Sequence, residues 1–408
     1  MDSVGIYLSV PFCRSKCTYC NFASGVFPAS YFERYVARVE DDLRGARACV
    51  AGWGVVLPER VDSIYLGGGT PSLLPAELLQ RLFAAIRNNF AVDADAEITV
   101  ECAPGQLEDE ALAAMAACGV NRVSFGVQSF VDEEARRAGR LHSRAVALRD
   151  VERVRAAGIG RVNLDLIAGL AGQTRDSWRC SLETLRGAEP DHASVYMLEV
   201  DEDSRLGREL GKGGQRYSAA LVPEEDAIAE MYVEAVEFLE QRGLAQYEIS
   251  NFARSGGESR HNLKYWRREA YLGLGLDAHS MLRDDEGRAL RFATTDDLDG
   301  FLQGPGWAEP QRLSREEELE EAWFLGLRLN AGLDLAALRT EFGAEAVGRL
   351  DSVIAEMVSD GLMEREGRRV RLTLRGRLLS NEVFERFVGE PVNHAGNENN
   401  LFAEAGSY

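Results

Sequence analysis

The stretch VPFCRSKCTYCNFAS, residues 10–24, places Cys13, Cys17 and Cys20 within eight positions, directly after the apolar run GIYLSV. A cuboidal iron–sulfur cluster has four irons and normally takes four thiolates. Three cysteines spaced CxxxCxxC on one loop would therefore leave one iron open as a reaction site. The alternatives are a zinc site, which would need a fourth ligand nearby, and three incidental thiols. We favour the cluster, because the missing fourth ligand would then have a function.

Short β-branched runs continue along the chain beyond this first one. They are DSIYLGG (62–68), EITVEC (97–102), NRVSFGV (121–127), RVNLDLIA (161–168) and ASVYMLEV (193–200). Amphipathic stretches separate the runs, and one apolar helical face is formed by Phe32, Tyr35, Val36, Val39 and Leu43. This alternation is typical of βα units on a parallel sheet. Six units are too few to close an eight-stranded barrel, so we predict an α/β fold with an open, partial (β/α)6 TIM-like barrel.

The 408 residues exceed the length of one average domain, so we expect a large domain followed by a smaller one. We place the barrel core at residues 1–285 and a polar linker that contains Gly and Pro at 286–312. Residues 313–390 read as helices followed by a β-ribbon, which predicts a small winged-helix-like α+β domain. We expect residues 391–408 to be a flexible tail.

The composition argues against two classes of partner. Lys and Arg number 46 against 66 Asp and Glu, a net charge of −20, whereas a nucleic-acid binder normally carries the opposite sign. The N-terminus lacks the basic start of a signal peptide, and no stretch approaches the roughly 20 apolar residues of a membrane span. We therefore expect a cytoplasmic protein, in which clustered cysteines bind metal more often than they form disulfides.

The segment YLGGGTPS, residues 65–72, ends the second apolar run with three glycines. Glycines would let a ligand approach bare backbone. The alternative is a tight turn before the helix that Pro75 starts. Because the unusual motifs fall at the carboxyl ends of predicted strands, where the loops of a barrel gather, we expect them to form a single site.

These motifs carry a resemblance to known proteins. CxxxCxxC after the first strand, followed by GGGTPS after the second, resembles the radical S-adenosylmethionine (SAM) enzymes. The similarity narrows to the HemW haem chaperones, relatives of oxygen-independent coproporphyrinogen III oxidase (HemN), and runs from about residue 5 to 285 and more loosely to about 388. It is carried by YLGGGTPSLL, GVNRVSFGVQSF, NLDLIAGLAGQT, YEISNFARSGGESRHNLKYW and YLGLGLDAHS.

The resemblance implies a role for individual residues of the core. Cys13, Cys17 and Cys20 would ligate a [4Fe-4S] cluster, with SAM on its open iron. The implied SAM contacts are Tyr7, Gly68, Gly69, Thr70, Glu101, Gln128, Arg140 and Asp165. Carboxylates and amides suit the sulfonium, the ammonium and the ribose hydroxyls of SAM. For Gln128 and Arg140 the alternative is a structural amide or a salt bridge.

The segment HNLKYW, residues 261–266, resembles the family's haem-binding HNxxYW motif. It implies that His261 is a haem ligand and Tyr265 a ligand or contact, since imidazole is a common axial ligand of haem iron. Either residue could instead pack the barrel mouth, and His279 is a further candidate. The expected partners are haem and an unidentified haem-accepting protein.

Several positions depart from related patterns, among them residues 101–105, where ECAPG replaces the more usual EANPG but keeps Glu101 and Pro104. Ser9 replaces the histidine of the usual YxHxPFC, and Asp277 stands where glycine is usual, near the expected haem region. Phe22 stands where HemN-type enzymes carry a fourth cysteine. Phe22 favours a chaperone that transfers haem over the alternative, a radical SAM coproporphyrinogen III oxidase that forms protoporphyrinogen IX. The sequence leaves open whether the protein is an enzyme.

Overall fold

A twelve-stranded sheet forms the body of the protein in a computed structural model that describes residues 3–202, 204–304 and 306–388. The strand order is β12-β11-β10-β9-β1-β2-β3-β4-β5-β6-β8-β7, so the sheet ends at β12 and β7 and stays open. Its first six strands are β1 (Ser3–Val10), β2 (Arg60–Gly68), β3 (Ala91–Cys102), β4 (Arg122–Gln128), β5 (Arg161–Ala168) and β6 (His192–Met197). These six are parallel, which confirms the predicted open, partial barrel.

Shorter strands extend both edges of this parallel sheet. They are β7 (Ala245–Gln246), β8 (Asn251–Ala253), β9 (Tyr271–Gly275), β10 (His279–Arg283), β11 (Ala289–Ala293) and β12 (Gln311–Arg312). β9 runs parallel to β1, and β10 to β12 continue from it antiparallel. β8 lies antiparallel against β6 and β7.

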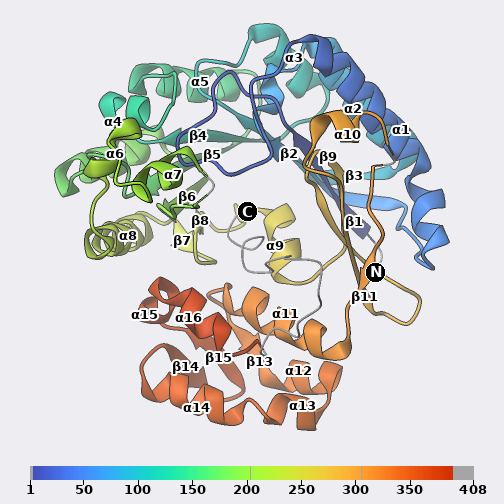
Figure 1. Ribbon diagram of the computed structural model, residues 1–408, viewed down its shortest axis with the longest axis vertical. Coiled ribbons are helices and arrows are strands. Elements are labelled where there is room, and N and C mark those ends of the chain that lie inside the picture. Colours follow the sequence, from blue (N-terminus) through green and yellow to red (C-terminus); the bar gives the residue numbers. More distant parts are fainter. Residues whose placement is uncertain (1–2, 203, 305, 389–408) are drawn as a thin grey trace.

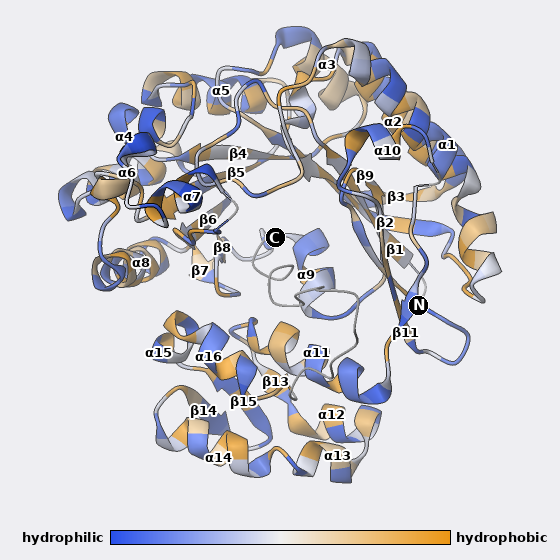
Figure 2. Ribbon diagram, in the orientation of Figure 1, coloured by the Kyte–Doolittle hydropathy of each residue, from blue (hydrophilic) through white to orange (hydrophobic). Residues whose placement is uncertain are grey.

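Most helices of the core lie on the outer side of the curved sheet, whereas α9 lies inside it (Figure 1). The helices are α1 (Ser30–Gly52), α2 (Ala76–Asn89), α3 (Asp109–Ala117), α4 (Asp132–Arg137), α5 (Arg144–Ala156), α6 (Arg175–Ala188), α7 (Arg205–Leu210), α8 (Glu225–Glu240), α9 (Arg260–Trp266) and α10 (Leu298–Phe301), with short 3-10 turns at Pro71–Leu73 and Arg216–Leu221. The outer helices carry both hydrophobic and hydrophilic residues (Figure 2). In α1 the predicted apolar face is buried at Tyr35, Val36, Val39 and Leu43, because it packs against the sheet.

The segment predicted as a linker contains part of the sheet. Within residues 286–312, β11 pairs with β10 and β12 pairs with β11. β11 buries Leu290 completely and leaves Phe292 only 4% exposed. The polar residues on either side of this short strand hid it in the composition, so the prediction of a plain linker was wrong.

The C-terminal part is a small α+β unit, as predicted. It contains α11 (Arg315–Leu327), α12 (Leu335–Phe342), α13 (Ala344–Gly348), α14 (Asp351–Ser359), α15 (Leu374–Leu378) and α16 (Ser380–Glu385). Its strands β13 (Leu333–Asp334), β14 (Met363–Glu366) and β15 (Arg369–Leu372) form an antiparallel sheet in the order β13-β15-β14. Two helices follow the predicted ribbon, the first capped by the Thr373 side chain. The tail predicted at 391–408 lies outside the described residues.

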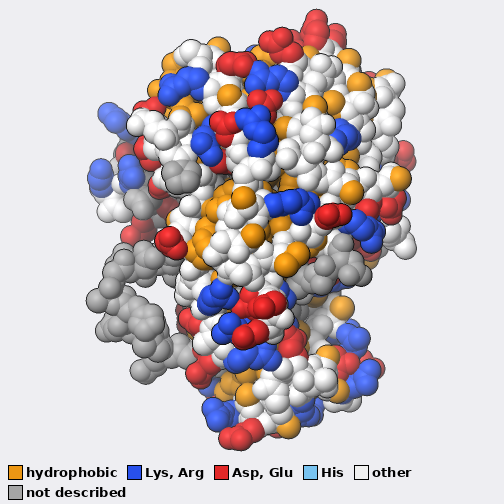
Figure 3. All heavy atoms as spheres, turned by 90° about the vertical axis from the view of Figure 1, so that its right-hand side faces the viewer, with side chains coloured by type: hydrophobic (Ala, Val, Ile, Leu, Met, Phe, Trp, Pro, Cys, Tyr) orange, Lys and Arg blue, Asp and Glu red, His pale blue; other side chains and the backbone are white. Residues whose placement is uncertain are grey.

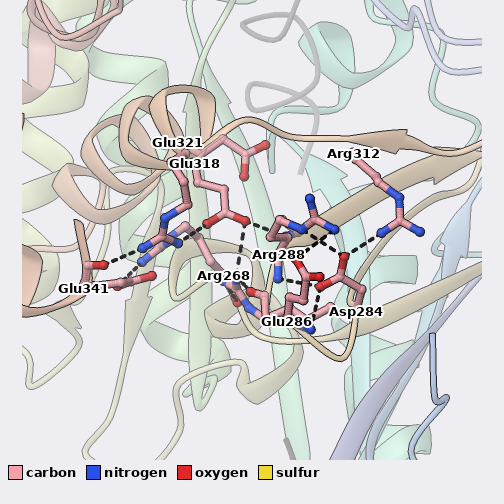
Figure 4. A network of polar contacts seen from close by, with 12 residues as sticks. Arg268, Asp284, Glu286, Arg288, Arg312, Glu318, Glu321 and Glu341 are labelled. Carbon is pink, nitrogen blue, oxygen red and sulfur yellow. Dashed lines mark hydrogen bonds and ion pairs between the residues drawn. The ribbon is translucent and has the colours of Figure 1, made fainter. Parts of the chain in front are cut away.

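A network of ion pairs joins the start of α11 to the β10–β11 hairpin (Figure 4). Glu318 is 1% exposed, accepts a hydrogen bond from the Ala289 amide and pairs with Arg315 at 2.7 Å. Glu321 pairs with Arg291 at 2.8 Å. Charge-assisted contacts of this kind are stronger than neutral hydrogen bonds, so they fix the C-terminal unit against the sheet edge.

The distribution of charged side chains on the surface and the hydropathy of the helices are relevant to possible partners. Acidic and basic side chains are interspersed over the face in Figure 3, with hydrophobic side chains between them. Across residues 3–202, 204–304 and 306–388, no helix is both long enough and apolar enough to traverse a membrane.

Candidate functional site

A cavity of about 560 Å³ opens at the carboxyl ends of the parallel strands and reaches the C-terminal unit. Its volume is within the range of about 300–1,000 Å³ found for small-molecule sites. Every position expected to contact the cluster or SAM lines it: Tyr7, Cys13, Cys17, Cys20, Gly68, Gly69, Thr70, Glu101, Gln128, Arg140 and Asp165. Residues from five successive strands, β1 to β5, and from three loops therefore meet at one cavity.

The cysteine loop is held directly against the glycine motif. The Gly69 amide donates to the Val10 carbonyl and the Thr70 amide to the Phe12 carbonyl, each at 2.8 Å. A Cβ at Gly69 would lie 2.7 Å from the Val10 oxygen and 2.8 Å from the Phe12 oxygen. The glycine is therefore required by close backbone packing. The glycine segment is expected from the sequence either to let a ligand approach the backbone or to form a tight turn. The two interpretations are compatible, because Gly68 and Gly69 pack against the cysteine loop and also line the cavity.

The three thiols have few protein partners. An Arg140 guanidinium nitrogen lies 3.3 Å from the Cys17 sulfur, and the Thr70 hydroxyl lies 4.0 Å from the Cys13 sulfur. Burial raises the pKa of Cys13 and of Cys20. Burial disfavours the charged thiolate, which is the form of cysteine that binds metal. A bound cation would therefore stabilise these thiolates. In the described chain, no group of three or more His, Cys, Asp or Glu is arranged to hold a single metal ion.

Two half-buried carboxyl groups, Glu101 and Asp165, line the cavity from β3 and β5. The Tyr65 hydroxyl donates to Glu101 at 2.8 Å, and the Asn163 amide donates to Asp165 at 2.6 Å. Burial, with the nearby Asp165 charge, raises the pKa of Glu101 to about 7, and burial also raises the pKa of Asp165. Desolvation and mutual repulsion both disfavour the ionised forms of two neighbouring acids. A cationic ligand would offset both effects, so the pair favours such a ligand.

Gln128 and Arg140 complete this wall of the cavity. Gln128 has a φ of 69°, and within the described chain its buried Oε1 atom has no hydrogen-bond partner. An unsatisfied buried carbonyl oxygen is costly, so a ligand donor suits this position. Arg140 donates to the Gly126 carbonyl and to Cys17, rather than to a carboxylate among the described residues. The structure therefore does not show the alternative salt bridge.

The histidine of the HNxxYW segment lies behind the cavity wall. His261 is fully buried, with Nδ1 3.0 Å from the Ser63 hydroxyl oxygen and Nε2 2.9 Å from the Tyr265 hydroxyl oxygen. Burial and the Lys264 charge lower the pKa of His261 to about 3, so the imidazole is neutral. Tyr265 lines the cavity and His261 does not. Both ring nitrogens are thus engaged, so direct ligation of iron by His261, as expected from the sequence, would require one of these hydrogen bonds to break.

Asp277 and Ser9, two of the residues that depart from the family pattern, do not line the cavity. Asp277 lies between β9 and β10 with a φ of 52°, and its carboxylate is 4.0 Å from His279 Nε2. His279 does not line the cavity either. The expectation that Asp277 places a carboxylate near the haem region stays a prediction. Ser9 is buried below Gly68, where a Gly68 Cβ would lie 2.6 Å from its hydroxyl oxygen.

Sequence reasoning missed several residues of the cavity. Tyr65, which donates a hydrogen bond to Glu101, is the first residue of the YLGGGTPS segment, so its place near a strand end was a usable signal. Phe324 of α11 and Arg328, which directly follows α11, also line the cavity. Nothing near them in the sequence connects them to the cysteine loop, because only the docking of the C-terminal unit brings them there.

Comparisons with known proteins agree with this architecture. A model of the Radical SAM superfamily matches residues 7–185, and the HemN C-terminal domain matches residues 313–379. The chain is 33% identical to the "Heme chaperone HemW" of Bacillus subtilis, over 94% of this chain and 99% of the relative. It is 32% identical to the Escherichia coli protein of that name, over 96% and 99%. The solved structure of E. coli coproporphyrinogen III oxidase (HemN), a radical SAM enzyme, is similar in fold, with a TM-score of 0.80, 24% identity and coverage of 95% and 90%.

Proposed function

This chain belongs to the HemW family of radical SAM proteins, and we propose that it is a haem chaperone that binds haem and a SAM-coordinated [4Fe-4S] cluster and transfers haem to an acceptor protein. Membership of the superfamily implies the cluster and SAM. The observation that carries the proposal is that the three cysteines, the half-buried acids Glu101 and Asp165, and Tyr265 line one cavity. The similarity to relatives named as haem chaperones supports haem as the molecule that is bound and transferred.

The residues at the cluster end fit the implied cofactors. Cys13, Cys17 and Cys20 would hold three irons, and Glu101 and Asp165 would attract the cationic groups of SAM. The buried Gln128 Oε1 atom would accept one of its hydrogen bonds. When bound, the cluster would offer its open iron to SAM and, once reduced, would supply the electron for SAM cleavage. The protein's contribution is to orient SAM and to shield it from water.

Tyr265 is the residue that we propose to contact haem, with His261 as its hydrogen-bond partner. A neutral His261 that donates from Nδ1 to Ser63 accepts the Tyr265 O–H at Nε2. A phenol held in this way is polarised toward the phenolate, and Tyr oxygen is an established type of haem ligand. Tyr265 would therefore meet the haem, and His261 would set its orientation and basicity.

The experiment that tests the proposal measures haem binding by anaerobically reconstituted protein. One haem per chain is expected in an absorption titration. Tyr265→Phe and His261→Ala should each weaken binding, by roughly tenfold or more if the contact is lost. His142→Ala is the matched control, because His142 is also buried but does not line the cavity. Unchanged affinity and spectrum in both the Tyr265→Phe and the His261→Ala variants would remove this pair from the site.

The same preparation tests the alternative, a coproporphyrinogen III oxidase. The likeness to HemN at 24% identity concerns the fold. Phe22, which lines the cavity mouth and is 40% exposed, takes the place of the fourth cysteine of HemN-type enzymes. Incubation with coproporphyrinogen III, SAM and a reductant should yield no protoporphyrinogen. Clear turnover would reverse the ranking of the two functions.

A further inference from the structure

The end of the cavity beneath the C-terminal unit contains a buried arginine. Arg328 follows the last residue of α11, is 8% exposed and lines the cavity together with Ser380 and Asn381 of α16. Its position is fixed by neighbouring backbone contacts. Leu329 forms a β-bridge with Glu248, and the Asn330 amide donates to the Tyr247 carbonyl at 3.0 Å.

The Arg328 guanidinium has no polar partner within the described part of the chain. Its buried Nε makes no hydrogen bond, and no carboxylate of a described residue lies within ion-pair distance of the group. It lies over the Trp266 ring, with its central carbon 4.4 Å from the ring centroid. Stacking satisfies the face of a guanidinium but leaves the N–H groups at its edge without acceptors. A buried cation in this state is costly unless a ligand pairs with it.

Two acids near Arg328 do not supply that partner. Glu199 and Glu248 interact with it electrostatically but at more than the 4.0 Å of an ion pair. Glu248 is fully buried and its own Oε2 atom also lacks a hydrogen-bond partner among the described residues. The arginine and these acids are thus held apart, so the guanidinium remains available to a molecule in the cavity.

We propose that Arg328 binds a carboxylate of the molecule that fills this end of the cavity, namely a propionate of haem; this assignment rests on the proposed function. A planar guanidinium matches a carboxylate in a bidentate pair. Trp266, on which Arg328 stacks, directly follows Tyr265 in α9. The haem-contacting tyrosine and the carboxylate-binding arginine are therefore joined through one aromatic residue. Ser380 and Asn381 provide further hydrogen-bonding groups at the same end.

This assignment gives the C-terminal unit a part in recognition. The arginine directly follows α11 and its polar neighbours lie on α16, whereas Tyr265 lies on α9 of the barrel side. Helices α9 and α11 are in contact. A ligand that bridges Tyr265 and Arg328 would therefore contact both parts of the protein.

The test compares ferric haem with its dimethyl ester, which keeps the iron and the macrocycle but lacks the carboxylates. Wild-type protein should bind haem about 10- to 100-fold more tightly than the ester, as expected for charge-assisted hydrogen bonds. Arg328→Gln should bring this ratio close to one by weakening haem alone. Arg349→Gln is the matched control: Arg349 belongs to the same C-terminal unit, but its exposed side chain pairs with Glu345 and does not line the cavity, so this variant should keep the wild-type ratio.

The outcomes separate this inference from the proposed function. An Arg328→Gln protein that keeps the wild-type ratio would overturn the role of Arg328 and leave haem binding intact. Wild-type protein that binds neither compound would overturn the proposed function and the propionate assignment with it. In ligand-free protein, Arg328→Met should preserve or raise the midpoint of thermal unfolding, since it removes an unpaired buried charge. A marked fall would show that Arg328 is structural and would also overturn the inference.

Discussion

Glu101 is the side chain whose ionisation bears most directly on SAM binding. It is held between the Tyr65 hydroxyl and the cavity, and burial together with Asp165 raises its pKa to about 7. A carboxyl group with a raised pKa is protonated below that pH and ionised above it. If SAM binds as a cation beside Glu101, its affinity should follow the ionised fraction of this group.

We therefore expect the affinity for SAM to rise with pH and to level off above about pH 7, the pKa of Glu101. Below that value it should fall by up to about tenfold per pH unit. Glu101→Gln should weaken binding and flatten this profile, because the amide does not titrate. Equilibrium dialysis of SAM against reconstituted wild-type and Glu101→Gln protein between pH 5.5 and 8 measures the affinity and its pH dependence. A variant with the wild-type profile would assign the titration to another group, with Asp165 the next to test.

At the level of elements, the β2 glycine motif and the cysteine loop behave as one unit. Two backbone hydrogen bonds tie residues 69–70 to the start of the loop at Val10 and Phe12. Close packing of the two backbones leaves no room for a Cβ at Gly69. The position of the thiols therefore depends on a residue that carries no side chain.

Gly69→Ala should displace the loop, because its methyl group would lie 2.7 Å from the Val10 carbonyl oxygen. We expect a loss of about 1–3 kcal/mol in the free energy of unfolding, as for other overpacked sites, and a lower iron content after reconstitution. Urea unfolding and iron and sulfide analysis measure these effects. Gly160→Ala is the control, since nothing lies within 4 Å of a Cβ there. Equal iron content in both variants would contradict the coupling.

For the whole molecule, the important feature is how the C-terminal unit is attached to the barrel. One end of α11 is held by Glu318 and Glu321 against the β10–β11 hairpin, and the other end by Leu329 and Asn330 against the 245–253 hairpin. Between these attachments α11 delivers Phe324 and Arg328 to the cavity. The docking of the unit therefore completes the site.

Glu318→Gln should loosen this docking, because the amide keeps the shape of the carboxylate but loses its charge-assisted contacts with Arg315 and the Ala289 amide. The expected cost is about 1–3 kcal/mol. Amide hydrogen exchange should become faster in α11 to α16, with little change in β1 to β6. Glu316→Gln, an exposed position on the same helix, should leave exchange unchanged. Equal protection in the two variants would argue that apolar packing alone fixes the unit.

The sequence by itself determined the features whose cause is local. The six parallel strands follow from β-branched runs that alternate with amphipathic stretches, because this periodicity decides which faces are buried. The cysteine loop, the glycine motif and the strand-end acids could be predicted to meet, since parallel strands bring their carboxyl ends to one edge. The polar composition around β11, by contrast, concealed a strand that its pairing with β10 stabilises.

Only the tertiary structure decided which side chains reach the cavity. The HNxxYW spacing places His261 and Tyr265 one helical turn apart, but the packing of α9 buries the histidine and brings the tyrosine to the cavity. Arg328 is separated by more than 300 residues from the cysteines with which it shares that cavity. Its unpaired charge arises from the docking of two units, and sequence spacing does not encode such contacts, because they depend on long-range packing.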